Sequence, residues 1–369
     1  MKRFKYADER ISEKEIMIAI PSIVIGVGIL SMPKELASVT VGSDGWIPLL
    51  IVGLFATLIT WAIAKFASGF QGQTFLTYAS NIVTKPVAII LTSMFAVLSI
   101  FITAYQIRKI SNISQQYLFD QTPIEVIAVT FLLVVVYAVS GSRVALFRIN
   151  MMFMPIILFI ALTLVVFNVG WLDIGNLMPV FQTPLNGYVE VLKNTGGISY
   201  LGFGILWFYL SLVDKPKKAP KAAAIGMCIP IGLYMILFIM CISTFGNAVT
   251  SNLLYPVIEL AKVVEIPGGF FERFESIFFV IWIMAIFITA TMAMDIGVLA
   301  LNLIFKKSEK LKIIFILTPI IYLVGMFPQD IVEVDFLGSI MGWMMIILNI
   351  TVLILLSVVA KIRGVKRNE

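Results

Sequence analysis

The most constraining feature of this sequence is a series of apolar runs, each about twenty residues long, that follow one another along the chain. About twenty apolar residues in a helix cross a bilayer. Ten runs fall at 16–37, 46–68, 86–110, 123–140, 145–168, 189–212, 222–245, 274–304, 312–327 and 336–360. Only 13% of the 369 residues are charged, roughly half the usual share in soluble proteins. We therefore expect an all-α polytopic membrane protein, with residues 1–369 forming a single membrane domain.

The basic residues predict an orientation for these ten spans. If the N-terminus is cytoplasmic, 21 of the 27 Lys and Arg residues lie on the cytoplasmic side. The outer side holds Lys34, Arg108, Lys109, Lys193, Lys262 and Arg273. This asymmetry follows the positive-inside rule, and it places short N- and C-terminal tails in the cytoplasm. Topology and the lipid bilayer account for the basic charge, so we expect no nucleic acid as a partner.

The ten spans divide into two units of five, about 14–168 and about 189–360. Because five is odd, the second unit enters the membrane from the opposite side, as in an inverted repeat. The first span of each unit has a glycine-rich interruption, at residues 26–28 and at residues 196–204. Unwinding frees backbone groups that membranes tolerate only beside a cavity. This pattern predicts broken helices 1 and 6 around a binding site; close helix packing through small residues is the alternative.

Several kinds of chemistry are disfavoured by the residues themselves. The chain has no histidine, which removes His-based metal sites, catalytic triads and proton switches. Cys228 and Cys241 lie in one expected helix, too far apart along its axis for a disulfide. We find no nucleophile–base pair and no phosphate-binding loop, and we expect neither an enzyme nor a cofactor.

The interruption in the first span also carries a family resemblance. Gly26-Val27-Gly28-Ile29-Leu30, followed by Pro33, resembles the first-helix motif of the amino acid–polyamine–organocation permeases. Further stretches narrow the resemblance: Asp44-Gly45-Trp46, Asp120-Gln121-Thr122-Pro123-Ile124, Asn176-Leu177-Met178-Pro179-Val180, Tyr255-Pro256-Val257-Ile258-Glu259-Leu260 and Phe271-Glu272-Arg273-Phe274-Glu275-Ser276. Together they resemble the B subunit of spore germinant receptors over essentially the whole chain.

This resemblance implies a LeuT-type fold and a role in spore germination. It also implies receptor A and C subunits as partners, and the spore inner membrane or the bacterial cell membrane as the location. Two functions remain open. The first is a sensor that binds a nutrient, an amino acid above all, and signals to partner subunits. The second is a proton- or Na⁺-coupled amino-acid permease of the same fold.

An amino acid would use the two interruptions in different ways. The backbone amides around residues 26–28, at a helix N-terminus, suit its carboxylate. The freed carbonyls near Val24, Ile25, Ser199 and Tyr200 suit its ammonium group. Aromatic side chains would enclose its side chain, although ordinary helix packing or an interface belt explains them equally well. The expected ligand-binding residues are Val24, Ile25, Gly26, Val27, Gly28, Tyr105, Ser199, Tyr200, Leu201, Gly202, Phe203 and Trp282.

Ionisable residues inside spans are rare and often functional. Asp295, which shares a helical face with Thr291, is either a cation or proton site coupled to conformation or a partner of Arg143 or Arg148. Arg108 either gates the outer side or extends its charge to the membrane surface. Gln106 is neutral where some relatives look acidic, which argues against cation coupling.

The stretch 254–267, before the eighth span, has the spacing of a short helix. We expect it to form either a lid over the outer vestibule or a solvated loop helix.

Overall fold

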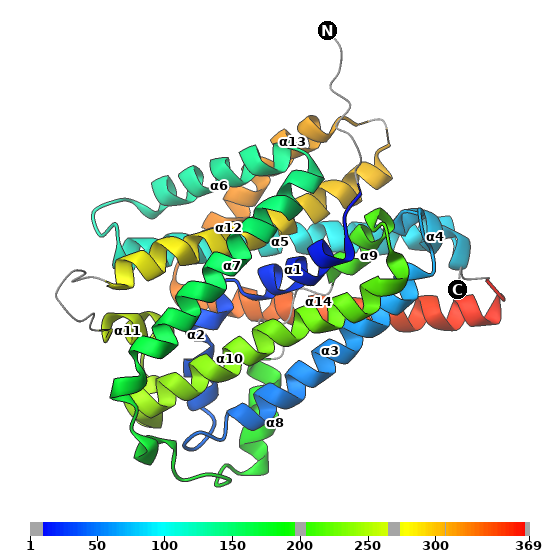
Figure 1. Ribbon diagram of the computed structural model, residues 1–369. Helices are drawn as coiled ribbons and strands as arrows, with labels where there is room; N and C mark the ends of the chain where they lie inside the picture. The colour runs from blue at the N-terminus through cyan, green and yellow to red at the C-terminus, as the bar shows by residue number, and fades with distance from the viewer. Residues whose placement is uncertain (1–9, 196–203, 265–273, 307, 366–369) are drawn as a thin grey trace.

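A computed structural model of the chain describes residues 10–195, 204–264, 274–306 and 308–365. These residues form a helical bundle, as the sequence predicts (Figure 1). The α-helices are α1 (Glu13–Val24), α2 (Gly28–Ala37), α3 (Trp46–Ser68), α4 (Phe75–Ile82), α5 (Lys85–Tyr117), α6 (Ile124–Ser140), α7 (Arg143–Phe167), α8 (Leu185–Thr195), α9 (Leu206–Tyr209), α10 (Ala219–Thr250), α11 (Pro256–Lys262), α12 (Phe274–Ile304), α13 (Lys310–Met326) and α14 (Ile331–Ile362).

Six of the described helices are long and apolar enough to cross a membrane: α3, α5, α7, α10, α12 and α14. The pair α1 and α2, bent by 56°, makes a seventh if it counts as one span. The protein is therefore a multi-pass membrane protein. Helices α6 and α13 have 17 residues each, and part of the expected sixth span lies outside the described residues. The count of ten spans remains a prediction.

Helix α12 has the most buried apolar stretch of the six long spanning helices described. It runs antiparallel to α5 along much of its length (Figure 1). Helix α1 packs against α7, α10 and α12, and α3 packs against α10. The outer helices expose large apolar side chains, such as Leu54, Phe55 and Leu58 on α3. Such an apolar surface is expected where helices face lipid tails.

Helix α1 lacks one internal hydrogen bond about one turn before the break between α1 and α2. Pro21 lies within α1, and a proline inside a helix leaves the carbonyl four residues earlier without its amide partner. That carbonyl belongs to Met17, and Gly226 of α10 approaches so closely that a Cβ there would overlap its oxygen. Helix α1 ends at Val24 and α2 begins at Gly28, so residues 25–27 connect two differently directed segments.

The segment before α3 and the segment before α8 are hydrogen-bonded to one another at the end of the bundle near α2. Asp44 accepts hydrogen bonds from the amides of Phe181 (2.5 Å), Gln182 (2.8 Å) and Thr183 (2.9 Å). The Ser43 hydroxyl donates to the Leu177 carbonyl at 2.9 Å. Asp44 therefore holds the connection between α7 and α8 in place.

These contacts set the acidity of the Asp44 carboxyl group, which lies between the spans. Burial alone would raise its pKa, but the amides of Thr183, Phe181 and Gln182 and the Thr183 hydroxyl stabilise the carboxylate and lower the pKa below its usual value.

Candidate functional site

Side chains from other helices hold the backbone of the break. The Trp282 indole donates to the Gly26 carbonyl at 3.3 Å, and the Thr289 hydroxyl donates to the Ser22 carbonyl at 2.9 Å. The Val24 carbonyl accepts from the Tyr234 hydroxyl at 2.7 Å and from the Gly26 amide at 2.9 Å. Because these two donors occupy both lone pairs of the Val24 oxygen, our expectation that this carbonyl is free for a ligand ammonium is wrong.

The backbone amides of the break have fewer hydrogen-bond partners among the described residues than its carbonyls have. The Val27 amide has no hydrogen-bond acceptor within the described parts of the chain. Gly28 and Ile29 stand in the first turn of α2, where amides have no acceptor within the helix. These three amides stand at the N-terminal, electropositive end of α2, which suits an anionic group.

A small cavity of about 30 Å³ lies beside the break. Its walls come from α1, α2, α5, α12, α14 and the segment before α9. They are formed by Ile23, Val24, Gly26, Gly28, Phe95, Ser99, Ile102, Tyr105, Gln106, Gly204, Ile205, Thr289, Ala293, Ile296 and Met345. A water molecule needs roughly 10–15 Å³ by this measure, so the cavity as it stands holds two or three water molecules at most.

The predicted ligand-binding residues take different positions relative to this cavity. Those that line it are Val24, Gly26, Gly28 and Tyr105. Ile25, Val27 and Trp282 are fully buried beside it without lining it. The predicted residues Ser199, Tyr200, Leu201, Gly202 and Phe203 lie outside the described residues.

Three polar residues of the cavity were absent from the predicted set: Ser99, Gln106 and Thr289. The Gln106 side-chain oxygen is buried and has no donor within the described residues. The sequence held one signal for the part of the cavity wall that α12 contributes. Trp282, Thr289 and Ile296 recur every seven residues on α12, and this spacing places them on one helical face.

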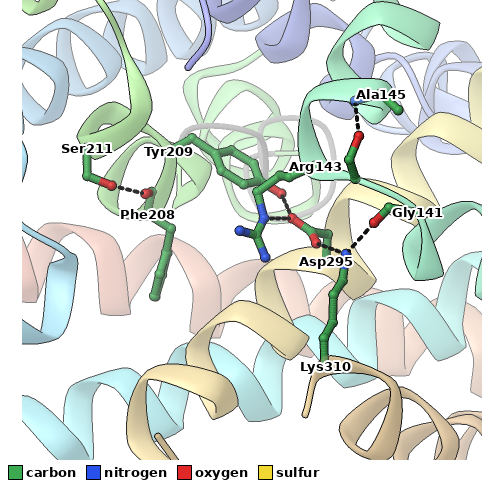
Figure 2. Close-up of polar contacts among 9 residues, drawn as sticks. Gly141, Arg143, Ala145, Phe208, Tyr209, Ser211, Asp295 and Lys310 are labelled. Carbon is green, nitrogen blue, oxygen red and sulfur yellow. Dashed lines mark hydrogen bonds and ion pairs between the residues drawn. The ribbon is translucent and has the colours of Figure 1, made fainter. Parts of the chain in front are cut away.

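A charged cluster lies at one end of α12, and we call it the Asp295 cluster (Figure 2). The fully buried Asp295 carboxylate accepts from Arg143 Nε at 2.6 Å and from the Tyr209 hydroxyl at 2.8 Å. Lys310 Nζ lies 3.8 Å from the other carboxylate oxygen and donates to the Gly141 carbonyl at 2.7 Å. The cluster thus joins α7, α9, α12 and the start of α13.

This arrangement answers part of the question that the sequence left open. Asp295 pairs with Arg143, one of the two arginines named as its alternative partners, whereas Arg148 is exposed. Thr291 is buried, and its hydroxyl donates to the Ile288 carbonyl of its own helix at 2.9 Å. At the same end, Ile11 pairs with Val213 in the β-bridge, which brings the start of the chain against the segment after α9.

The opposite end of the bundle has its own network, which we call the Lys109 cluster. The buried Lys109 of α5 forms an ion pair with Asp335 of α14 and lies 5.4 Å from the centre of the Tyr255 ring. Tyr117 donates to Glu259 of α11 at 2.9 Å. Helix α11 packs against α2 and α12 and is largely buried, so it is not a solvated loop helix.

Arg108 is buried, which excludes one of its two sequence interpretations; its role as an outer gate stays a prediction. Helix α5 continues to Tyr117, so Arg108 lies well inside the helix and is 8% exposed. Its guanidinium donates to the Pro328 carbonyl at 3.1 Å and to Met326 Sδ at 3.5 Å. A buried side chain of this kind does not extend its charge to the membrane surface.

Comparison with known sequences identifies the family. The family described as "Spore germination protein" matches residues 10–334. The chain belongs to this family. Spore germination protein GerLB of Bacillus cereus is 40% identical over 93% of this chain and 92% of its own length. Spore germination protein YndE of Bacillus subtilis (strain 168) is 30% identical over 98% of each chain.

Solved structures of other proteins are similar in fold to this germination protein. MhsT in complex with L-phenylalanine superposes with a TM-score of 0.69 at 16% identity, covering 95% of this chain and 98% of that one. Mhp1, a nucleobase-cation-symport-1 family transporter, gives a TM-score of 0.68 at 13% identity and covers 91% and 75%. The fold is therefore similar to that of LeuT-type transporters.

Proposed function

We propose that this germination protein is the nutrient-sensing subunit of a germinant receptor, and that it binds an amino acid at the break between α1 and α2. The observation that supports this most directly is the set of amides at residues 27–29 beside a cavity with hydroxyl and amide side chains. The amides suit a carboxylate. The Gln106 side-chain oxygen, which lacks a donor among the described residues, suits the ammonium group.

The proposed site lies between two closed ends. The Asp295 cluster lies on one side of the cavity, and the Lys109 cluster with α11 lies on the other. An amino acid is larger than the present cavity, so binding has to move the walls apart. A ligand that binds one arrangement better shifts the population toward it, and this shift is the signal that we propose.

The two ends would act as gates on opposite sides of the membrane. We propose that the Asp295 cluster, with Thr291 on the same helix, controls the cytoplasmic end, and that α11 covers the outer end. This orientation follows the distribution of basic residues along the sequence, with both termini in the cytoplasm. We further propose ten spans in an inverted five-plus-five repeat, with the first and sixth spans broken at the ligand.

The signal would pass to partner proteins, for which we propose the receptor A and C subunits. The chain would thus act by binding and not by catalysis. A coupled amino-acid permease is the second candidate, and it is favoured by the likeness in fold to Mhp1, which is described as a transporter, and by the buried Asp295 within a span. Fold alone does not decide between these functions.

Reconstitution separates the two candidates. The purified protein, placed in liposomes, should be stabilised against heat by individual amino acids and yet accumulate them poorly. Concentrative uptake driven by a proton or Na⁺ gradient would instead favour the permease, and the loss of that uptake in Asp295→Asn would identify the coupling residue. Spores that lack the chain, tested with single nutrients, then show which amino acid triggers germination.

A further inference from the structure

A second cavity lies at the Lys109 end of the bundle, away from the break. It has a volume of about 580 Å³ and lies between α5, the start of α6 and the connection from α13 to α14. Most of its lining side chains are amides or charged groups, with Arg108 and Asn112 on its α5 wall. It shares no lining residue with the cavity beside the break, so the two are separate.

The α5 wall of this second cavity carries donors that the protein does not satisfy. Of the five N–H groups of the Arg108 guanidinium, one reaches a carbonyl and one reaches a thioether. Arg108 Nε and Asn112 Nδ2 have no acceptor within the described chain. No carboxylate of the described residues forms an ion pair with Arg108. Because a buried cation without an ion-pair partner is costly, this wall is suited to an added anionic group.

The rim of the cavity has the opposite charge. Glu125, in the first turn of α6, and Asp330, which caps α14, both line the cavity and are exposed. A simple anion at Arg108 would be repelled by these two carboxylates. A small molecule with both a carboxylate and an ammonium group meets a complementary charge at each end.

We infer that this cavity binds a small zwitterion of the α-amino-acid class, as a second site separate from the break. The carboxylate lies against Arg108 and Asn112, and the ammonium group lies toward Glu125 and Asp330. The few apolar lining residues, such as Ile124 and Ile331, offer little surface for acyl chains, so a free solute suits the cavity better than a phospholipid.

The test uses the full chain in nanodiscs with Gly28→Leu as background, so that binding at the break does not contribute. Glycine is the zwitterionic probe, acetate lacks the ammonium group, and methylamine lacks the carboxylate. Glycine should raise the melting temperature, and Arg108→Gln should weaken this effect roughly ten- to a hundredfold in concentration. The exposed Arg148→Gln removes the same charge elsewhere and should leave the effect unchanged.

Glu125→Gln provides a test that does not depend on a buried residue. Glu125 is exposed, so the variant should fold normally. It should weaken glycine binding by roughly two- to fivefold and should strengthen acetate binding, because the repulsive carboxylate has gone.

Two results would overturn the inference. One is equal stabilisation by glycine with and without Arg108. The other is a phospholipid retained by the Arg108 protein, absent from Arg108→Gln in native mass spectrometry, with no effect of glycine. Either result leaves the proposal for the break untouched, because every variant carries Gly28→Leu.

Discussion

Trp282 of α12 donates its indole N–H to the Gly26 carbonyl at 3.3 Å, so α12 holds the first break directly. Thr289, two turns further along α12, donates to the Ser22 carbonyl in the last part of α1. Helix α12 thus replaces hydrogen bonds that a continuous helix would have made within itself. A movement of α12 relative to α1 would therefore change the shape of the cavity through these two side chains.

The topology has a direct prediction. A reporter fused after Lys310 or at Glu369 should be cytoplasmic, and one placed near Gln329 should be external, because the basic residues gather at one set of span ends. Paired phosphatase and fluorescent-protein fusions measure this. An external C-terminus would contradict the five-plus-five arrangement.

The contact between α1 and α10 predicts unequal effects of two glycine substitutions on α10. A methyl group at Gly226 would overlap the Met17 carbonyl oxygen, whereas a Cβ at Gly232 meets nothing within 4 Å. Gly226→Ala should therefore lower stability by about 1–3 kcal/mol, and Gly232→Ala should leave it unchanged or slightly raised. Melting temperatures in detergent compare the two; similar values would argue against this close approach.

Asp44 predicts a pH dependence of stability. Its folded pKa is below the unfolded value of about 3.9, so its stabilisation is present above that value and is lost as pH falls through the folded pKa. Asp44→Asn should cost roughly 1–3 kcal/mol at pH 7. The difference in melting temperature between wild type and variant should shrink toward pH 3. A difference that stays constant with pH would mean that the carboxylate charge is not what matters.

Asp295 predicts a change in the response to nutrient. Asp295→Asn removes the charge that faces Arg143 and Lys310, so the cytoplasmic end should open more easily and germination should need less nutrient. The protein should also lose stability, because breaking a buried ion pair commonly costs about 3–5 kcal/mol. Spore dose-response curves and melting temperatures measure both effects. Arg148→Gln is the matched control, because Arg148 is exposed. An unchanged dose response with lowered stability would leave Asp295 a structural residue.

Much of the fold could be predicted from the sequence because membrane-spanning helices depend on length and apolarity. The second run, 46–68, has the bounds of α3. The Gly26-Val27-Gly28 stretch marks where α1 and α2 separate. Arg143 could be named as a partner of Asp295 because a charge in a membrane span requires one.

The contacts of the site could not be predicted in the same way. Apolar residues surround these helices on every side, so periodicity does not indicate which face is internal. Tyr234 and Val24 are 210 residues apart in sequence, and Asp44 and Thr183 are 139 apart. Gln106 was noticed for its missing charge, and only the packing of α5 against α12 places it in the cavity. Gly53 of α3 is another example, because nothing in the sequence shows that a Cβ there would overlap Ile231.

Gly26 lies in the break and is closely surrounded by side chains of α5 and α12. A Cβ there would lie 3.1 Å from Thr289 Oγ1 and 3.2 Å from Gln106 Nε2. Gly26→Leu should therefore fill the cavity and abolish the nutrient response while membrane insertion remains normal. Gly28→Leu should have the same effect, because Gly28 lines the same cavity.

The most direct measurement is the nutrient dose response of spores carrying Gly28→Ala, with Gly232→Ala as the matched control. If the amides at residues 27–29 bind the ligand carboxylate, the added methyl group at residue 28 should obstruct its approach, and the loss of one charge-assisted hydrogen bond is worth roughly 1.5–3 kcal/mol. Gly28→Ala should then need about ten- to a hundredfold more nutrient, and Gly232→Ala should respond as wild type. Normal insertion of Gly28→Ala with a wild-type response would place the ligand site elsewhere.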